Sequence, residues 1–377
     1  MISIVIPLYN KARHIARAIQ SVLDQTYSDF ELVVVNDGST DGSAEVVKTF
    51  EDPRVRLVHR EHFDSWGGHA ARNLGIAEAR TDLIAFLDAD DEWMPEHLET
   101  IRRIAKNYPE CGAYATAYEI IDTSHRRSVP KFKDIPKSPW EGVIPNYFRS
   151  SLGQDPVWSS GVAVWKSIFN LVGLFPVGIK CGGDREMWGR IALKYPIAFS
   201  NHVGAVYHKD ADNRIGLTVA PPKGDNILDK TLKHAIVTGN YRKEISKKDL
   251  IELLNWRALA RARGYIVSGE KREAWSYMKK VTLTRKSYKA LLIYYILIII
   301  PHGVFTLVNE LRAWLIELDL RTPRTVLGEL LRSGFGGIGE GLTLSRTSEG
   351  RLHEAQTKAR SSRLGYQTGD PQEVLGR

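Results

Sequence analysis

One stretch decides how this chain folds: Leu83-Ile84-Ala85-Phe86-Leu87-Asp88-Ala89-Asp90-Asp91. Its apolar half predicts a strand buried on both faces, and carboxylates follow at once. Hard divalent cations bind carboxylate oxygens and often keep substrate phosphates in their coordination shell. Acidic side chains also suit the start of a helix predicted over Pro95–Lys106, because the positive end of the helix dipole favours them. The stretch therefore predicts either a metal site or a solvated helix start at the end of a buried strand.

Strand-like and helix-like segments alternate around this stretch up to about residue 220. The expected strands are Ile2–Ile6 (ended by Pro7), Glu31–Val35, Val55–His59 and Leu83–Leu87, and the expected helices are Ala12–Asp24, Ala44–Phe50, Ala70–Ala79 and Pro95–Lys106. This alternation predicts an α/β fold with a doubly wound, mostly parallel, Rossmann-like sheet. Ligands of such sheets bind beyond the carboxyl ends of the strands. The turn Asn36–Gly42 and the acidic cluster both lie at such ends.

The composition narrows the class of protein. The 377 residues are 43% hydrophobic and 25% charged, which excludes a wholly disordered or collagen-like chain and leaves room for about two domains. The net charge of +8 suits phosphate-rich ligands or an anionic membrane, but it is too dispersed to predict nucleic-acid binding. Cys111 and Cys181 form no CxxC motif, so we expect a reducing compartment. Met1 leads directly into the first strand, and no signal peptide is expected.

The chain changes character after about residue 225. Residues 226–285 predict helices on either side of a turn at Gly269, as an extension of a first domain over residues 1–225. Ala290–Asn309 then holds twenty residues without a formal charge, enough to cross a bilayer, although Pro301 interrupts the run. Residues 318–377 are polar and weakly patterned, which predicts a mobile tail. A GxGxxG motif at 334–339 follows a helical stretch instead of a strand, so we interpret it as a linker.

A basic flank precedes the apolar segment. It consists of Lys271, Arg272, Lys279, Lys280, Arg285, Lys286 and Lys289, with Glu273 as the one acidic residue among them. Each such charge attracts anionic lipid by about 1 kcal/mol, and positive flanks stay on the cytoplasmic side. We therefore expect residues 286–317 to associate with the cytoplasmic face of the cell membrane, as a surface anchor in preference to a single span. A buried helix of the C-terminal region is the alternative.

Five motifs follow one another in a fixed order. They are Ile4-Val5-Ile6-Pro7-Leu8-Tyr9-Asn10, Val35-Asn36-Asp37-Gly38-Ser39-Thr40-Asp41, Ala71-Arg72-Asn73-Leu74-Gly75-Ile76, Phe86-Leu87-Asp88-Ala89-Asp90-Asp91 and Gly182-Gly183-Asp184-Arg185-Glu186-Met187-Trp188-Gly189-Arg190. Together they closely resemble family 2 glycosyltransferases of the GT-A fold, over about residues 2–220. The resemblance implies a nucleotide-diphosphate sugar as donor, Mn²⁺ or Mg²⁺ as cofactor, and inversion at the transferred carbon.

The resemblance also implies a nucleotide-binding set: Pro7, Leu8, Tyr9, Asp37, Arg72 and Asp88. The first three would line the pocket for the base. Asp37 would accept a hydrogen bond from a ring N–H of the base, as a carboxylate can. Arg72 would approach the nucleotide or its diphosphate, and Asp88 the ribose or the metal shell.

A metal site and a base follow from the same resemblance. Asp90 would bind the metal together with Asp88, and Asp91 and His208 are further metal candidates. A lone histidine after a strand is also commonly structural. Asp184 would be the general base that deprotonates an acceptor hydroxyl, although its place before an apolar helix face would also suit a helix N-cap.

The chain departs from the family's usual pattern in two places. Gly183 stands where the family usually has Glu beside the base. Lys11 and Ala12 follow Asn10 where an acidic residue is common. Residues Trp158, Ser159 and Ser160 are candidates for shaping the acceptor site, with a buried tryptophan as the alternative.

These observations predict a metal-dependent, inverting glycosyltransferase that acts on a hydroxyl acceptor. We expect a saccharide or lipid-linked saccharide as acceptor and a role in cell-surface polysaccharide or glycolipid synthesis. Uracil is the expected base, with guanine and thymine left open. A nucleotidyltransferase is an alternative, but it would need a glycine-rich phosphate loop where Pro7-Leu8-Tyr9-Asn10 stands. A non-catalytic nucleotide-fold protein at the membrane is the other alternative.

Overall fold

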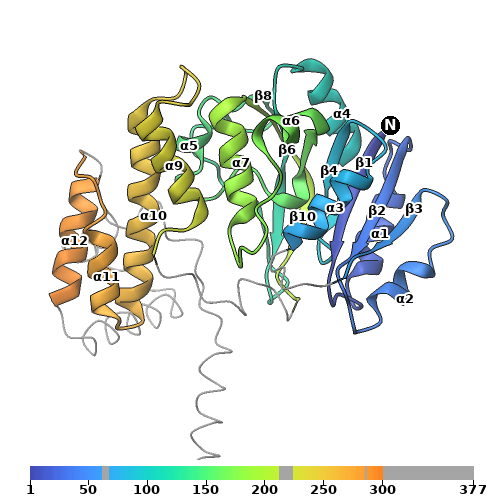
Figure 1. The fold of residues 1–377 in the computed structure, drawn as a ribbon, viewed down its shortest axis with the longest axis horizontal. Coiled ribbons are helices and arrows are strands. Elements are labelled where there is room, and N and C mark those ends of the chain that lie inside the picture. Colours follow the sequence, from blue (N-terminus) through green and yellow to red (C-terminus); the bar gives the residue numbers. More distant parts are fainter. Residues whose placement is uncertain (62–67, 212–223, 285–286, 300–377) are drawn as a thin grey trace, which may run out of the picture. The chain divides into compact units, whose positions relative to one another are not determined.

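The computed structural model describes residues 1–61, 68–211, 224–284 and 287–299 (Figure 1). All of them fall within one compact unit, Met1–Gly334. The predictions made for residues 300–317, for the tail 318–377 and for the GxGxxG motif lie outside the described residues.

The centre of the fold is a mixed sheet with the strand order β3-β2-β1-β4-β9-β6-β10-β5 (Figure 1). Its strands are β1 (Ile2–Leu8), β2 (Phe30–Asn36), β3 (Val55–His59), β4 (Leu83–Phe86), β5 (Glu92–Trp93), β6 (Ala113–Ile121), β7 (Arg127–Ser128), β8 (Glu141–Val143), β9 (Val162–Trp165) and β10 (Ile197–His208). The first four strands in this order are parallel, as are β6 and β10. Strand β9 runs antiparallel between β4 and β6. The predicted, mostly parallel sheet is confirmed.

Helices cover both faces of the sheet. They are α1 (Ile15–Leu23), α2 (Ser43–Lys48), α3 (His69–Glu78), α4 (His97–Asn107), α5 (Tyr147–Ser150), α6 (Lys166–Val172) and α7 (Gly183–Lys194). Side chains alternate across β1, so that Ile4 and Ile6 pack with α1 and α4 whereas Val5 packs with α3, α6 and α7. A strand with apolar residues on both of its faces requires this two-sided cover.

The first strand is longer than predicted. Pro7 does not end it, and β1 continues to Leu8 in register with β2. Pro7 lacks a backbone N–H, which would cost a hydrogen bond between two neighbouring strands. Pairing with β4 covers only Ser3 to Val5, however, so that β1 has no β4 partner beside Pro7. The missing donor therefore breaks no ladder.

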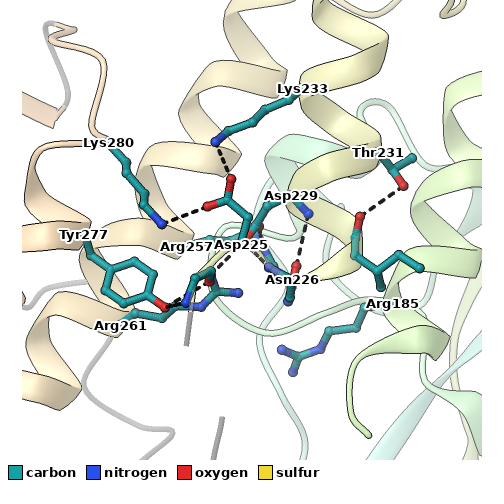
Figure 2. A network of polar contacts seen from close by, with 12 residues as sticks. Arg185, Asp225, Asn226, Asp229, Thr231, Lys233, Arg257, Arg261, Tyr277 and Lys280 are labelled. Carbon is teal, nitrogen blue, oxygen red and sulfur yellow. Dashed lines mark hydrogen bonds and ion pairs between the residues drawn. The ribbon is translucent and has the colours of Figure 1, made fainter. Parts of the chain in front are cut away.

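The predicted C-terminal helices are present as α9 (Ile227–Thr238), α10 (Lys247–Val267), α11 (Lys271–Met278) and α12 (Ser287–Ile299), with Gly269 in a left-handed turn between α10 and α11. A buried ion network joins α9 to α10 (Figure 2): Asp229 pairs with Arg257 at 2.6 Å and with Arg261 at 2.7 Å. Thr231 of α9 also donates to Glu186 of α7 at 3.0 Å, which ties these helices to the sheet domain. Over the described ranges, no helix is both long and apolar enough to cross a membrane.

The contact between α3 and β1 tolerates no side chain at Gly75. A Cβ atom there would lie 2.3 Å from Cγ1 of Val5. We predict that Gly75→Ala lowers the free energy of unfolding by about 1–3 kcal/mol, as overpacking does. The control is Gly264→Ala in α10, where a Cβ atom meets nothing within 4 Å; it should raise stability by about 0.5–1 kcal/mol. Urea denaturation of both variants tests this, and equal effects would contradict it.

Candidate active site

The acidic cluster after β4 is organised around the buried side chain of Asp91. One of its oxygens accepts from Ser160 Oγ at 2.5 Å and from Trp158 Nε1 at 3.2 Å. The other accepts from the backbone N–H of His208 at 3.2 Å. Burial, followed by the charges of Asp90 and Asp88, raises the pKa of Asp91 well above its ordinary value. Asp91 therefore faces the interior and joins three chain segments, so its oxygens are already engaged with protein donors.

Asp88 lies at the open side of the same turn and forms an ion pair with Arg72 of α3. Its backbone N–H donates to Ser160 Oγ at 3.1 Å. Burial raises the pKa of Asp88, Arg72 opposes this effect, and the charges of Asp90 and Asp184 add to it. The structure thus brings the predicted base into the electrostatic range of the strand-end carboxylates, although almost a hundred residues separate them in sequence.

Asp90 pairs with Lys11, whose Nζ lies 2.7 Å from Oδ2. Lys11 follows β1, and its position is one of the two departures from the family's pattern. The pair leaves both side chains only slightly exposed, at 13% and 14%. A cation at Asp90 would therefore share this carboxylate with Lys11 or displace it.

Asp184 stands in the first turn of α7, after Gly182 in the left-handed conformation. Ser159 Oγ lies 3.4 Å from its Oδ2. Burial alone would raise the pKa of Asp184, but the charge and backbone N–H of Arg185 lower it, as do His69 and Arg72. The result is a pKa below the ordinary value, so the carboxylate is ionised at neutral pH and able to accept a proton.

The predicted base pocket is only partly as expected. Asp37 is buried and pairs with Arg60, and its backbone N–H donates to the carbonyl of Leu8 at 2.8 Å. The side chain of Leu8 is fully buried in the apolar core beside α1 and α4, so it positions Asp37 through its backbone and lines no open pocket. Tyr9 is 46% exposed, and the ring of Pro7 faces Gly68, where a Cβ atom would lie 3.2 Å away.

His208 has a different neighbour from the one expected of a metal ligand. Its Nε2 atom lies 3.2 Å from Glu92 Oε2, and this contact lowers the pKa of Glu92. The backbone of His208 holds Asp91, as described above. This geometry favours the structural interpretation of His208.

Sequence reasoning missed the pairing of two cations with acidic residues. Arg60 follows β3 and pairs with Asp37, and Arg185 pairs with the half-buried Asp155 at 2.8 Å. No local pattern reveals these pairs, because each cation meets its partner only through the tertiary fold. The segment 158–160 was expected to shape an acceptor site. Ser159 contacts Asp184, and Ser160 contacts Asp88 and Asp91 of the acidic cluster.

Comparison with known proteins agrees with this geometry. Residues 3–157 match the family model described as glycosyl transferase family 2. The chain carries a family 2 glycosyltransferase domain. This match contains four of the five motifs on which the resemblance was based, and the fifth, around Asp184, lies beyond it.

Relatives of the glycosyltransferase domain include an uncharacterized glycosyltransferase of Rickettsia felis, 32% identical over 201 residues, which are 52% of this chain and 31% of that protein. TuaG of Bacillus subtilis, a glycosyltransferase provisionally named for teichuronic acid biosynthesis, is 36% identical over 101 residues, 26% of this chain and 39% of its own length. The chain spans about a third of the first curated relatives that it matches.

A solved structure with low sequence identity is similar in fold over most of this chain. TarS residues 1–349 of S. aureus, crystallised in complex with UDP-GlcNAc, has a TM-score of 0.59 and 17% sequence identity. The alignment covers 78% of this chain and 87% of that one. The similarity therefore extends beyond the family match to the C-terminal helices and confirms the predicted fold class.

The Ser160 hydroxyl bonds both Asp88 and Asp91 in the turn after β4, so its loss leaves a buried carboxyl group short of a donor. We predict that Ser160→Ala lowers the free energy of unfolding by about 1–3 kcal/mol. The control is Ser159→Ala, because the bond from Ser159 to Asp184 is long at 3.4 Å and should cost less. Thermal unfolding of both variants measures the difference. A Ser159 variant that is the less stable of the two would contradict this account.

Proposed function

We propose that this protein is a metal-dependent, inverting glycosyltransferase that moves a sugar from a nucleotide-diphosphate donor to a hydroxyl acceptor. One observation carries the proposal: two neighbouring serines link Asp184 to the acidic cluster, since Ser159 lies 3.4 Å from Asp184 and Ser160 bonds Asp88 and Asp91. Arg72 pairs with Asp88 at the same place. In this proposal Asp184 is the base, Arg72 binds the diphosphate, and Asp88 and Asp90 are the carboxylates at the end of the strand. This is the set of groups that the reaction requires.

The chemistry follows from these groups. The acceptor oxygen attacks the anomeric carbon and forms a new C–O bond there, while the bond from that carbon to the diphosphate oxygen breaks. The acceptor's proton passes to the carboxylate of Asp184. The diphosphate leaves with the electron pair, and Arg72 stabilises its charge. Attack from the face opposite the leaving group inverts the configuration.

The residues present fit a divalent cation. Asp88 and Asp90 are hard oxygen donors, and the repulsion that raises the pKa of Asp88 would be relieved by a positive charge between them. Across the described part of the chain, no three His, Cys, Asp or Glu side chains gather closely enough to hold a metal by themselves. We propose that Mn²⁺ or Mg²⁺ would be held by Asp88 and Asp90 and completed by phosphate oxygens of the donor. Such an ion would neutralise the departing diphosphate.

The donor and the acceptor class rest on the relatives. TarS was crystallised with UDP-GlcNAc, which supports a uridine nucleotide as the donor's leaving group here. TuaG carries a name from teichuronic acid biosynthesis, which supports a role in cell-surface polysaccharide or glycolipid assembly. A saccharide or lipid-linked saccharide is then the acceptor.

The nucleotide and the metal can be tested together. We predict that UDP with Mn²⁺ raises the thermal midpoint of the full-length protein, and that EDTA abolishes the shift. A ligand at a hundred times its Kd adds about 2.7 kcal/mol of stability. Asp90→Ala should lose the metal-dependent shift. Asp184→Asn should keep it while losing about 10²–10⁴-fold in sugar transfer or donor hydrolysis, because only the base is removed.

GDP, dTDP and CDP form the comparison set in the same assay. A shift with one of these instead of UDP would change the base assignment alone. No shift with any of them, in a folded sample, would overturn the transferase proposal in favour of a non-catalytic protein. Turnover of nucleoside triphosphates instead of nucleotide sugars would favour the nucleotidyltransferase.

A cytoplasmic membrane surface is part of the same proposal, and the exposed stripe of α12 supports it. Tyr288, Leu292, Ile296 and Ile299 recur at helical spacing and are 44%, 59%, 49% and 78% exposed. The neighbouring helix α11 adds Trp275, 41% exposed, whose ring stacks edge-on against Tyr295 with 5.1 Å between centroids. Exposed basic residues lie on α11, directly after it and on α12: Arg272, Lys279, Lys280 and Lys289. This combination fits an anionic lipid surface.

We predict that the full-length protein sediments with phosphatidylglycerol vesicles, less so with phosphatidylcholine vesicles, and less so at high salt. The variant Leu292→Asp/Ile296→Asp should lose at least half of this binding, because charged residues do not enter the acyl region. The control is Val237→Asp on α9, which changes a residue that is 85% exposed on a different helix. Equal binding by all three proteins would overturn the assignment of the surface to α12.

A further inference from the structure

The residue before the predicted base rests on a histidine ring. His69, the first residue of α3, is only 3% exposed, and Gly183 begins α7. A Cβ atom at Gly183 would lie 2.5 Å from Nε2 of His69 and 2.9 Å from both Cδ2 and Cε1. The imidazole thus fills the space that any side chain at position 183 would need.

The backbone does not demand a glycine at this position. Gly182 has a φ of 78° and therefore needs the freedom of glycine, whereas Gly183 does not adopt a left-handed conformation. The reason for glycine at 183 is space. It is also the position where the family usually carries Glu, so a ring from α3 stands here in place of a side chain from α7.

The histidine ring is itself held firmly. It packs on Phe175 with 6.1 Å between ring centroids. Asn73, one turn further along α3, exchanges two hydrogen bonds of 2.9 Å with the backbone of Phe175. Phe175 also packs edge-on against Trp188 of α7. The ring is therefore fixed between α3, which carries Arg72, and α7, which carries Asp184.

We propose that His69 and Gly183 form a matched pair that positions Asp184 against the donor-binding groups of α3. His69 is then a positioning residue for the base, an inference that rests on the proposed function. Gly183 directly precedes Asp184, so the contact with His69 lies next to the base. The charges of Arg185 and Arg72 lower the pKa of Asp184, and the charge of Asp184 raises the pKa of Asp88.

Two single variants and their combination test the pair. Gly183→Ala should lower the unfolding midpoint and reduce kcat about 100-fold, because a shift of the base by about 1 Å costs that much. His69→Ala should reduce kcat about tenfold and leave the donor KM within about twofold. The double variant should recover part of the unfolding midpoint and part of the kcat lost in Gly183→Ala, because the new Cβ atom no longer meets the His69 ring. The measurements are unfolding midpoints and UDP release from UDP-GlcNAc with water as acceptor, where water attacks the anomeric carbon and UDP leaves.

A control on the same helix separates positioning from packing. Gly189→Ala places a Cβ atom 2.7 Å from the end of Leu228 in α9, away from Asp184. It should lower the unfolding midpoint but reduce kcat less than His69→Ala does. The proposal is overturned if His69→Ala leaves kcat unchanged, if it lowers kcat no more than Gly189→Ala does, or if it fails to relieve Gly183→Ala. If the wild-type protein binds UDP but releases none from any UDP-sugar, the proposed function and the positioning role are both overturned. The unfolding midpoints of the four variants still decide whether His69 and Gly183 form a matched pair.

Discussion

The structure depends on one buried carboxylate. Asp91 is almost completely buried, and a polar carboxyl group in that position must be hydrogen-bonded. Its donors come from Trp158 and Ser160 on one segment and from the backbone at the end of β10 on another. Satisfying Asp91 therefore fixes the ends of β4 and β10 and the turn before β9 relative to one another. Asp88 and Asp90 then remain on the open side of the same turn.

Charge compensation around the site follows from that arrangement. Four acidic residues each pair with a cation from a different part of the chain: Lys11 for Asp90, Arg60 for Asp37, Arg72 for Asp88 and Arg185 for Asp155. Removing one partner of such a pair is costly, because the other charge stays behind. Under the proposed function, a charged ligand would replace one partner of such a pair without reorganising the backbone.

The helix that carries Asp184 is held from both sides. At its start, Gly183 lies on His69 of α3. One turn later, Glu186 accepts from Thr231 of α9 at 3.0 Å and pairs with Arg190 at 2.8 Å, while Arg190 also reaches the carbonyls of Val172 and Leu174. The C-terminal helices therefore contribute to holding α7 in place. Through α9 they support the element on which the predicted base stands.

The local pattern of the chain was enough to predict most elements of the sheet domain. Val55–His59 has the predicted bounds, and the acidic cluster follows β4, because apolar runs and polar turns are properties of neighbouring residues. The local pattern did not predict that Asp91 faces inward while Asp90 pairs with Lys11. It also did not predict that Leu8 is buried or that β1 continues through Pro7. Each of these depends on which strand or side chain lies alongside, and Ser160 is 72 residues away from the Asp88 that it contacts. The type of site was therefore predictable from the sequence alone. The partner and orientation of each charged side chain were decided by the packing of distant segments.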